Sequence, residues 1–183
     1  MSETTMSETI IRRARPSDAE TVADLGARTF SATFGHLYPP GDLAAFLAEA
    51  YDLDKTRVQL ADPGGATWLM ETDDGVAVGY VTVGACGLPH PDVTAQCGEL
   101  KRIYLLADWQ GGGRGSRLMA AALDWLAAEK AGDLWIGVWS GNAGAQKLYA
   151  RMGFEKAGEY HFKVGETRDH EFILRRRRSG DQR

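Results

Sequence analysis

The sequence predicts a single α/β domain of the α+β type, built on a central mixed, mostly antiparallel sheet of about seven strands with helices on both faces. Its length of 183 residues is typical of one domain and allows a substantial core. Its composition, with 44% hydrophobic and 25% charged residues, is ordinary for a soluble globular protein. Strand-like segments come first and then alternate with helix-like segments, and no domain-splitting linker interrupts the chain.

Residues 10–176 are predicted to form this domain, between a flexible segment at residues 1–9 and a basic and polar tail at residues 177–183. The arginine run at residues 175–178 is interpreted as a solvated tail. The formal net charge of −4 and the pI near 5.6 argue against nucleic acid as the main partner. No apolar run reaches the length of about 18 residues that a membrane span needs, and the N-terminal residues lack the apolar segment of a secretory signal.

The first helix is predicted over residues 16–34, where apolar residues recur at helical spacing. Ser17 is followed three residues later by Glu20, which is the spacing of a capping box at a helix start. A short strand, TIIRRA, precedes this helix at residues 9–14. Two further helices are predicted after it, over residues 39–51 and 54–62.

The rest of the chain changes to a period of two and then alternates between strand and helix. Residues 66–72 and 76–85 alternate and are joined by DDG, which is typical of a hairpin. A loop at residues 87–98 follows. Helices are predicted over residues 116–130 and 142–152. The remaining strands are predicted over residues 99–105, 134–139, 154–164 and 170–176.

Two cysteines, Cys86 and Cys97, flank the loop that contains prolines and glycine. So few cysteines in a chain of this kind favour free thiols, although a disulfide is the alternative. No CxxC motif or Cys/His cluster surrounds them, and His161 and His170 lack the spacing of metal ligands. We therefore expect no metal site.

The stretch DWQGGGRGSRL carries four glycines between a predicted strand and a predicted helix. Such a turn exposes backbone N–H groups at a helix N-terminus, which favours binding of a phosphate. The alternative is a tight turn whose glycines only allow close packing of helix on strand. Ser116 and Arg117 follow Gly115, where a Walker A loop needs lysine and then serine or threonine, and a dinucleotide-binding motif needs a glycine in place of Ser116. Neither nucleotide-binding motif fits.

Two motifs resemble those of the GNAT superfamily of N-acetyltransferases. Residues 110–115 fit Q-x-x-G-x-G, and residues 142–149 fit N-x-x-A-x-x-x-Y followed by a Met-Gly-Phe turn. The segment GEYHFKVGETRDHEFIL at residues 158–174 further resembles the PaiA-type branch, whose members acetylate polyamines such as spermidine. The resemblance implies a GNAT-like fold, acetyl-CoA as co-substrate, a cytoplasmic location and, at the level of the family, a homodimer.

The resemblance also implies which residues bind the coenzyme. The backbone of residues 103–105 would pair with the pantetheine arm and polarise the thioester carbonyl, and main-chain groups of residues 111–116 would hold the pyrophosphate. Arg114 would add charge there, Asn142 would contact the pantetheine, and Lys147 would reach an adenosine-side phosphate. Arg114 and Lys147 are equally well explained as solvated surface charges. The cofactor-binding residues implied in this way are Ile103, Tyr104, Leu105, Gln110, Gly111, Gly112, Gly113, Arg114, Gly115, Ser116, Asn142, Lys147 and Tyr149.

Two residues are the candidates for catalysis. Tyr149 would be the general acid toward the coenzyme sulfur, and its alternative is a helix residue with a buried ring. Glu99 stands where many GNAT enzymes carry a glutamate base, and its alternative is a carboxylate solvated at a strand end. Alternation predicts that Glu99, Lys101 and Ile103 share one face of their strand.

The acceptor site is expected near TFGHLYPP, because the first two helices usually wall the acceptor groove in this superfamily. His36 and Tyr38 would shape it. The charge of a polyamine would be offset by carboxylates, for which Glu49, Asp52 and Asp54 are candidates. Four tryptophans are interpreted as core or rim packing, namely Trp68, Trp109, Trp135 and Trp139.

Taken together, the residues and the resemblance predict an acetyl-CoA-dependent N-acetyltransferase. It would move an acetyl group to a primary amine, first of all a small cationic amine such as a polyamine, by direct transfer in a ternary complex. Alternatives of the same class are acetylation of protein N-termini, lysines or amine-bearing antibiotics. An alternative of a different class is an acetyl-CoA-binding sensor with little turnover. No nucleic acid and no membrane is expected as a partner.

Overall fold

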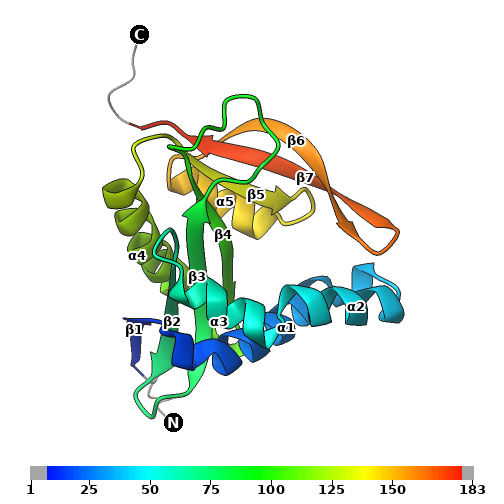
Figure 1. Ribbon diagram of the computed structural model, residues 1–183, viewed down its shortest axis with the longest axis vertical. Helices are drawn as coiled ribbons and strands as arrows, with labels where there is room; N and C mark the ends of the chain where they lie inside the picture. Colours follow the sequence, from blue (N-terminus) through cyan, green and yellow to red (C-terminus); the bar gives the residue numbers. More distant parts are fainter. Residues whose placement is uncertain (1–7, 179–183) are drawn as a thin grey trace, which may run out of the picture.

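The computed structural model describes residues 8–178 and contains one seven-stranded sheet in the order β1-β2-β3-β4-β5-β7-β6 (Figure 1). The strands are β1 (Thr9–Arg13), β2 (Ala66–Thr72), β3 (Ala77–Ala85), β4 (Gly98–Leu105), β5 (Leu134–Trp139), β6 (Glu155–Val164) and β7 (Thr167–Arg176). All neighbouring strands are antiparallel except β4 and β5, which are parallel. The predicted mixed, mostly antiparallel sheet in a single domain is therefore confirmed.

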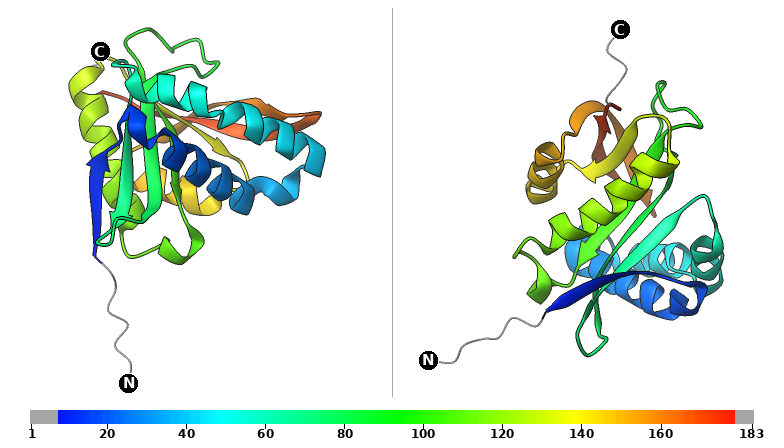
Figure 2. Two further views of the ribbon diagram at one scale, coloured as in Figure 1. Left: turned by 60° about the horizontal axis from the view of Figure 1, so that its bottom comes forward. Right: turned by 90° about the vertical axis from the view of Figure 1, so that its left-hand side faces the viewer.

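Helices cover both faces of the sheet, as predicted (Figure 2). They are α1 (Ala19–Phe34), α2 (Pro40–Ala50), α3 (Leu53–Ala61), α4 (Arg114–Glu129) and α5 (Ala143–Arg151). The helices α4 and α5 pack on one face over the largest apolar cluster, whereas α1, α2 and α3 lie on the other (Figure 2). No helix among residues 8–178 is long and apolar enough to cross a membrane.

The start of α1 differs from the prediction, because the Ser17–Glu20 capping box does not form. Asp18 is the N-cap residue and makes no side-chain cap. Its carboxylate instead accepts a 2.7 Å hydrogen bond from the Arg15 backbone N–H and pairs at 2.8 Å with Arg12. The same Arg12 pairs at 2.8 Å with Glu71 of β2, so this network joins β1, β2 and the start of α1. The Arg12 guanidinium hydrogen-bonds Asp18 and holds the pKa of that carboxyl below its usual value.

The parallel strands β4 and β5 pair only over their first residues, Gly98–Leu100 against Leu134–Ile136. Beyond this point β4 continues along β3, and β5 continues along β7. The carboxyl ends of the two strands therefore diverge (Figure 1). One edge of β4 is left without a neighbouring strand, and its backbone polar groups are available for another partner.

A β-bulge in β4 lies at this point of divergence. The register of the β3–β4 ladder shifts by one residue, and Lys101 is left without a partner. Because of the extra residue, Leu100 and Ile103 both pack in the apolar cluster under α4. The prediction that Ile103 shares the face of Glu99 is therefore wrong beyond the bulge.

The C-terminal arginines are not the solvated tail that their run predicts. Arg175 and Arg176 belong to β7, and Arg175 pairs with Asp92 at 2.8 Å and with Asp133 at 2.5 Å. The backbone N–H of Arg178 also donates to Asp133, at 2.9 Å. The remaining tail residues, 179–183, and residues 1–7 of the predicted flexible segment lie outside the described residues. Cys86 and Cys97 are both free thiols, as the composition favours.

Candidate active site

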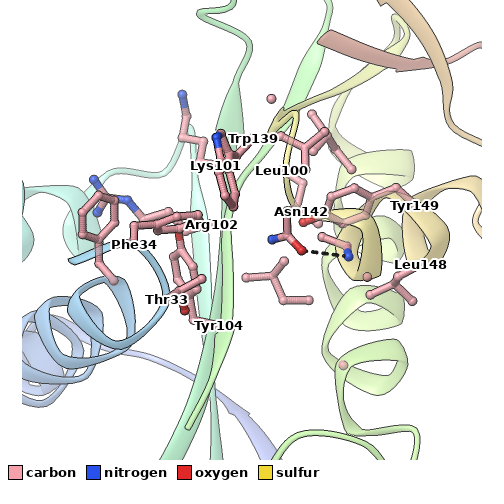
Figure 3. Close-up of a pocket in the computed structure, with 18 of the residues that line it drawn as sticks. Thr33, Phe34, Leu100, Lys101, Arg102, Tyr104, Trp139, Asn142, Leu148 and Tyr149 are labelled. Atoms are coloured by element: carbon pink, nitrogen blue, oxygen red, sulfur yellow. Dashed lines mark hydrogen bonds between the residues drawn. The ribbon is translucent and has the colours of Figure 1, made fainter. Parts of the chain in front are cut away.

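A cavity of about 750 Å³ opens where β4 and β5 diverge (Figure 3). It extends from the glycine loop before α4 and the first turns of α5, past β4, to a wall formed by α1, β6 and β7. Predicted site residues that line it are Tyr38, Glu99, Ile103, Tyr104, Leu105, Gln110, Gly111, Gly113, Gly115, Ser116, Asn142 and Tyr149. One cavity thus brings together most of the residues that the two motifs single out.

The glycine loop has a backbone that requires glycine. Gly111, Gly112 and Gly113 have φ angles of 82°, 61° and 75°, in the left-handed region that side chains disfavour. A Cβ built at Gly111 or Gly113 would meet no other atom within 4 Å. Close packing of helix on strand, the alternative interpretation, therefore does not explain these two glycines.

The loop leads directly into α4, whose N-cap residue is Gly113. Within the described part of the chain, the backbone N–H groups of Gly115 and Ser116 donate no hydrogen bond. Both residues line the cavity, so their N–H groups stand at a helix N-terminus beside an open space. A helix N-terminus of this kind favours an anion.

The two basic residues predicted near the phosphates lie outside the lining. The Arg114 guanidinium lies 5.3 Å from the centre of the Trp109 ring and donates to the carbonyl oxygen of Gly111 at 3.4 Å. Lys147 is exposed on α5. Gly112 also does not line the cavity.

Asn142 is the first residue of the second motif and lies at the start of α5. It is the N-cap residue, and its side-chain oxygen accepts a 3.1 Å hydrogen bond from the Ala145 backbone N–H (Figure 3). This cap explains the asparagine by local structure. Among residues 8–178 the amide nitrogen of the same side chain has no acceptor, and Asn142 lines the cavity.

Tyr149 of α5 lines the same cavity (Figure 3). Its side chain is only 6% exposed, and burial raises the pKa of its hydroxyl above the usual 10.0. Among the described residues the hydroxyl has no hydrogen-bond partner. A neutral hydroxyl in this place is able to donate a proton to a molecule in the cavity.

Glu99 of β4 is a half-buried carboxylate at the other side of the cavity. One of its oxygens, Oε2, accepts from the Gly87 backbone N–H at 2.9 Å and from Lys101 Nζ at 3.2 Å. The second oxygen, Oε1, forms no hydrogen bond with the described residues. Lys101 is the bulge residue, so the bulge supplies the cation that pairs with this carboxylate.

Of the two residues expected to shape the acceptor site, one lines the cavity. Tyr38 is buried and lines the cavity, and its hydroxyl donates a hydrogen bond to Asp169. Burial and this bond raise the pKa of Tyr38 above its usual value. His36 is exposed, in a short turn at Gly35–Leu37, and does not line the cavity.

The carboxylates proposed to offset a cationic substrate lie elsewhere and have partners. Glu49 pairs with Lys55 at 3.6 Å, and Asp52 caps α3 by accepting from the Lys55 backbone N–H at 2.8 Å. Asp54 pairs with Arg57 at 2.7 Å. None of the three acids lines the cavity, because all belong to the end of α2 and the start of α3.

The sequence reasoning missed two acids that do line the cavity, Asp169 and Glu171 of β7. Glu171 accepts a 2.5 Å hydrogen bond from the Tyr160 hydroxyl of β6, and burial raises the pKa of its carboxyl. Carboxylates two residues apart on a strand share a face. The two-residue spacing was the signal available in the sequence, but the predicted strand began only at residue 170. Trp139, interpreted as packing, also lines the cavity.

Among residues 8–178, no group of three or more histidine, cysteine, aspartate or glutamate side chains is placed to hold a metal ion.

Comparison with known proteins identifies the family. The sequence profile of the acetyltransferase (GNAT) family matches residues 28–154. An uncharacterized N-acetyltransferase from the pepI 3′ region of Lactobacillus delbrueckii subsp. lactis is 31% identical over 152 residues, which cover 83% of this chain and 87% of that protein. Streptothricin acetyltransferase of Streptomyces lavendulae is 31% identical over 155 residues, which cover 80% of this chain and 82% of that protein.

Solved structures share the fold. The crystal structure of the PaiA N-acetyltransferase from Thermoplasma acidophilum, in complex with coenzyme A, aligns with a TM-score of 0.74 over 93% of this chain and 99% of that chain, at 16% identity. At this identity the likeness concerns the fold alone. The profile match and the two relatives at 31% identity show that this protein belongs to the acetyltransferase (GNAT) family and is an N-acetyltransferase.

Proposed function

We propose that the protein transfers the acetyl group of acetyl-CoA directly to a primary amine, in a complex that holds both substrates, and that the amine is a small cation such as a polyamine. One observation carries the proposal. A single cavity has backbone N–H groups at a helix N-terminus at one end and, at the other, two carboxylates for which the described residues supply no basic partner. The first end suits the diphosphate of a coenzyme, and the second suits an ammonium group.

The donor end is formed by backbone rather than by charged side chains. The free N–H groups of Gly115 and Ser116 would hold the diphosphate, and the open edge of β4 at residues 103–105 would pair with the pantetheine arm. The free amide nitrogen of Asn142 would donate to the same arm. Acetyl-CoA, when bound, supplies the activated acetyl group.

The chain's own side chains would move two protons. The amine must be neutral to form the new C–N bond, and the unengaged Oε1 of Glu99 would accept its proton, directly or through water. As the C–S bond breaks, the Tyr149 hydroxyl would donate its proton to the departing sulfur. The raised pKa of Tyr149 keeps that proton in place until the thiolate forms.

The proposal is tested by measuring thiol release from acetyl-CoA with a panel of amines and identifying the products by mass spectrometry. The panel contains monoamines, diamines, spermidine, spermine, a peptide with a free N-terminus and lysine. Selective turnover of the polyamines with a product one acetyl group heavier is the expected result. Coenzyme binding without turnover on any amine would instead favour a sensor.

A second candidate acceptor is the amine of an antibiotic. The similarity to streptothricin acetyltransferase, at 31% identity over most of both chains, favours its inclusion. Streptothricin is therefore added to the panel. A kcat/KM for streptothricin far above that for every polyamine would favour this alternative.

A further inference from the structure

We propose that Asp169 and Glu171 of β7 select the acceptor by binding its alkylammonium group in an aromatic pocket at the end of the cavity formed by α1, β6 and β7. The inference rests on the proposed function, since it assigns the specificity of that same site to two residues. Neither residue belongs to the glycine loop or to the Asn142–Tyr149 motif.

The sheet places the two carboxylates side by side on the cavity face. Asp169 and Glu171 are two residues apart on β7 and therefore share a face. Glu171 stands directly between Trp139 of β5 and Tyr160 of β6, and Asp169 stands opposite Phe162 of β6. Directly opposite residues of antiparallel strands also share a face, so three aromatic side chains surround the pair.

A glycine makes room for this arrangement. A Cβ built at Gly137 of β5 would lie 2.6 Å from the Tyr160 hydroxyl and 3.4 Å from Glu171 Oε2. Any other residue at this position would displace the tyrosine that donates to Glu171. The backbone of β5 is thus close to the carboxylate, with no side chain between them.

The chain supplies no cation to either carboxylate. Throughout residues 8–178, no lysine, arginine or histidine forms an ion pair with Asp169 or Glu171, and each accepts a neutral tyrosine hydroxyl instead. Two half-buried carboxylates close together are costly without an opposite charge. A cationic ligand would supply that charge.

The walls of the pocket also suit a cation. Aromatic side chains line the cavity, among them the three that stand opposite the two carboxylates, namely Trp139, Tyr160 and Phe162. Aromatic faces attract alkylammonium groups, and their apolar surface accommodates the attached methylene chain. Across the same cavity, the 6% exposed Tyr149 has a hydroxyl without a partner among the described residues. The Tyr149 hydroxyl and two carboxylates without a cationic partner among the described residues thus line one cavity.

The tip of the β6–β7 hairpin lies near α2 (Figure 1), and side chains join these two parts of the molecule. Tyr38 reaches Asp169, and the Glu166 backbone N–H donates to Asp42 of α2 at 3.4 Å. The rings of Phe46 and Phe162 meet edge to face, with centroids 5.7 Å apart. These three contacts join the N-terminal helices to the hairpin beside the two carboxylates.

The test uses the isosteric variants Asp169→Asn and Glu171→Gln, which keep an oxygen acceptor for Tyr38 and Tyr160 but remove the charge. The matched control is Glu166→Gln at the tip of the same hairpin, whose side chain is 96% exposed. The probes are 1,4-diaminobutane and butylamine. For each variant, kcat and the KM values of the amine and of acetyl-CoA are measured, and binding of 1,4-diaminobutane to the enzyme with coenzyme A is measured by calorimetry.

We expect each variant to raise the KM and the Kd of 1,4-diaminobutane by about tenfold or more, with the KM of acetyl-CoA unchanged. The control should keep all constants. An unchanged amine KM in both variants, with active wild-type enzyme, would overturn this inference and leave the proposed function standing. No thiol release by the wild type with any amine of the panel would overturn both. An unchanged acetyl-CoA KM shows that a variant is folded.

Discussion

Replacing Tyr149 by phenylalanine should lower kcat while leaving the stability of the fold and the binding of the coenzyme nearly unchanged. The hydroxyl is the only group removed. Within residues 8–178 it makes no hydrogen bond, and its ring is already packed at 6% exposure, with Phe154 at a centroid distance of 6.5 Å. The free energy of unfolding should therefore change by less than about 1 kcal/mol.

The effect on the rate should be much larger. A positioned general acid contributes about 10²–10⁴-fold. We therefore expect kcat to fall about 100-fold or more, which corresponds to an increase of about 2.7 kcal/mol in the activation free energy. The KM of acetyl-CoA should change little, because the backbone of the glycine loop and of β4 provides most of the expected coenzyme contacts.

The assay is steady-state thiol release at saturating amine, combined with thermal unfolding of both proteins. Since burial raises the pKa of Tyr149 above 10.0, the wild-type rate should show no loss from ionisation of this tyrosine below that pH. A Tyr149→Phe enzyme with an unchanged kcat and an unchanged unfolding temperature would refute the role of the hydroxyl as proton donor.

Three further predictions concern the other parts of the site. Burial raises the pKa of Glu171 above its usual 4.5, so ionisation of this carboxyl lowers the stability of the folded protein as the pH rises above 4.5. The Glu171→Gln variant should therefore unfold at a higher temperature than the wild type near neutral pH. Below pH 4.5 the two proteins should unfold at the same temperature. Glu99→Gln should lower kcat and leave the KM of acetyl-CoA unchanged, and an unchanged kcat would dismiss Glu99 as the base. Gly113→Ala forces a side chain into a φ of 75° and should weaken coenzyme A binding, measured by calorimetry, about tenfold. The control variant Gly41→Ala in α2 should bind coenzyme A as the wild type does.

Local patterns were sufficient for the elements and for the glycine loop. Each strand and helix shows its own period in the sequence, so the order of elements is predicted without knowledge of their neighbours. The loop at residues 111–113 is predicted for a similar reason, since consecutive left-handed residues require glycine at those positions. Asn142 is likewise identified locally, because a cap and its helix are adjacent in the chain.

What the sequence did not reveal depends on contacts between distant segments. The helix start near Asp18 is set by Arg12, which also binds Glu71 of another strand. The bulge at Lys101 is defined only by its pairing with β3. The divergence of β4 and β5 arises because each continues along a different neighbour.

Asp169 and Glu171 were missed for a similar reason. The last strand was predicted from residue 170, whereas β7 begins at Thr167 and so includes Asp169. Acids in an exposed strand usually face water. Only the pairing of β7 with β5 and β6 turns the face that carries Asp169 and Glu171 toward the cavity.

The account depends most directly on the proposed diphosphate site at residues 111–116, and a comparison of two ligands by calorimetry tests it. Coenzyme A carries the diphosphate, and pantetheine carries the same thiol arm without it. We predict measurable heat and a micromolar or lower Kd for coenzyme A, and binding at least about tenfold weaker for pantetheine. No heat with coenzyme A, or equal affinity for the two ligands, would contradict the account.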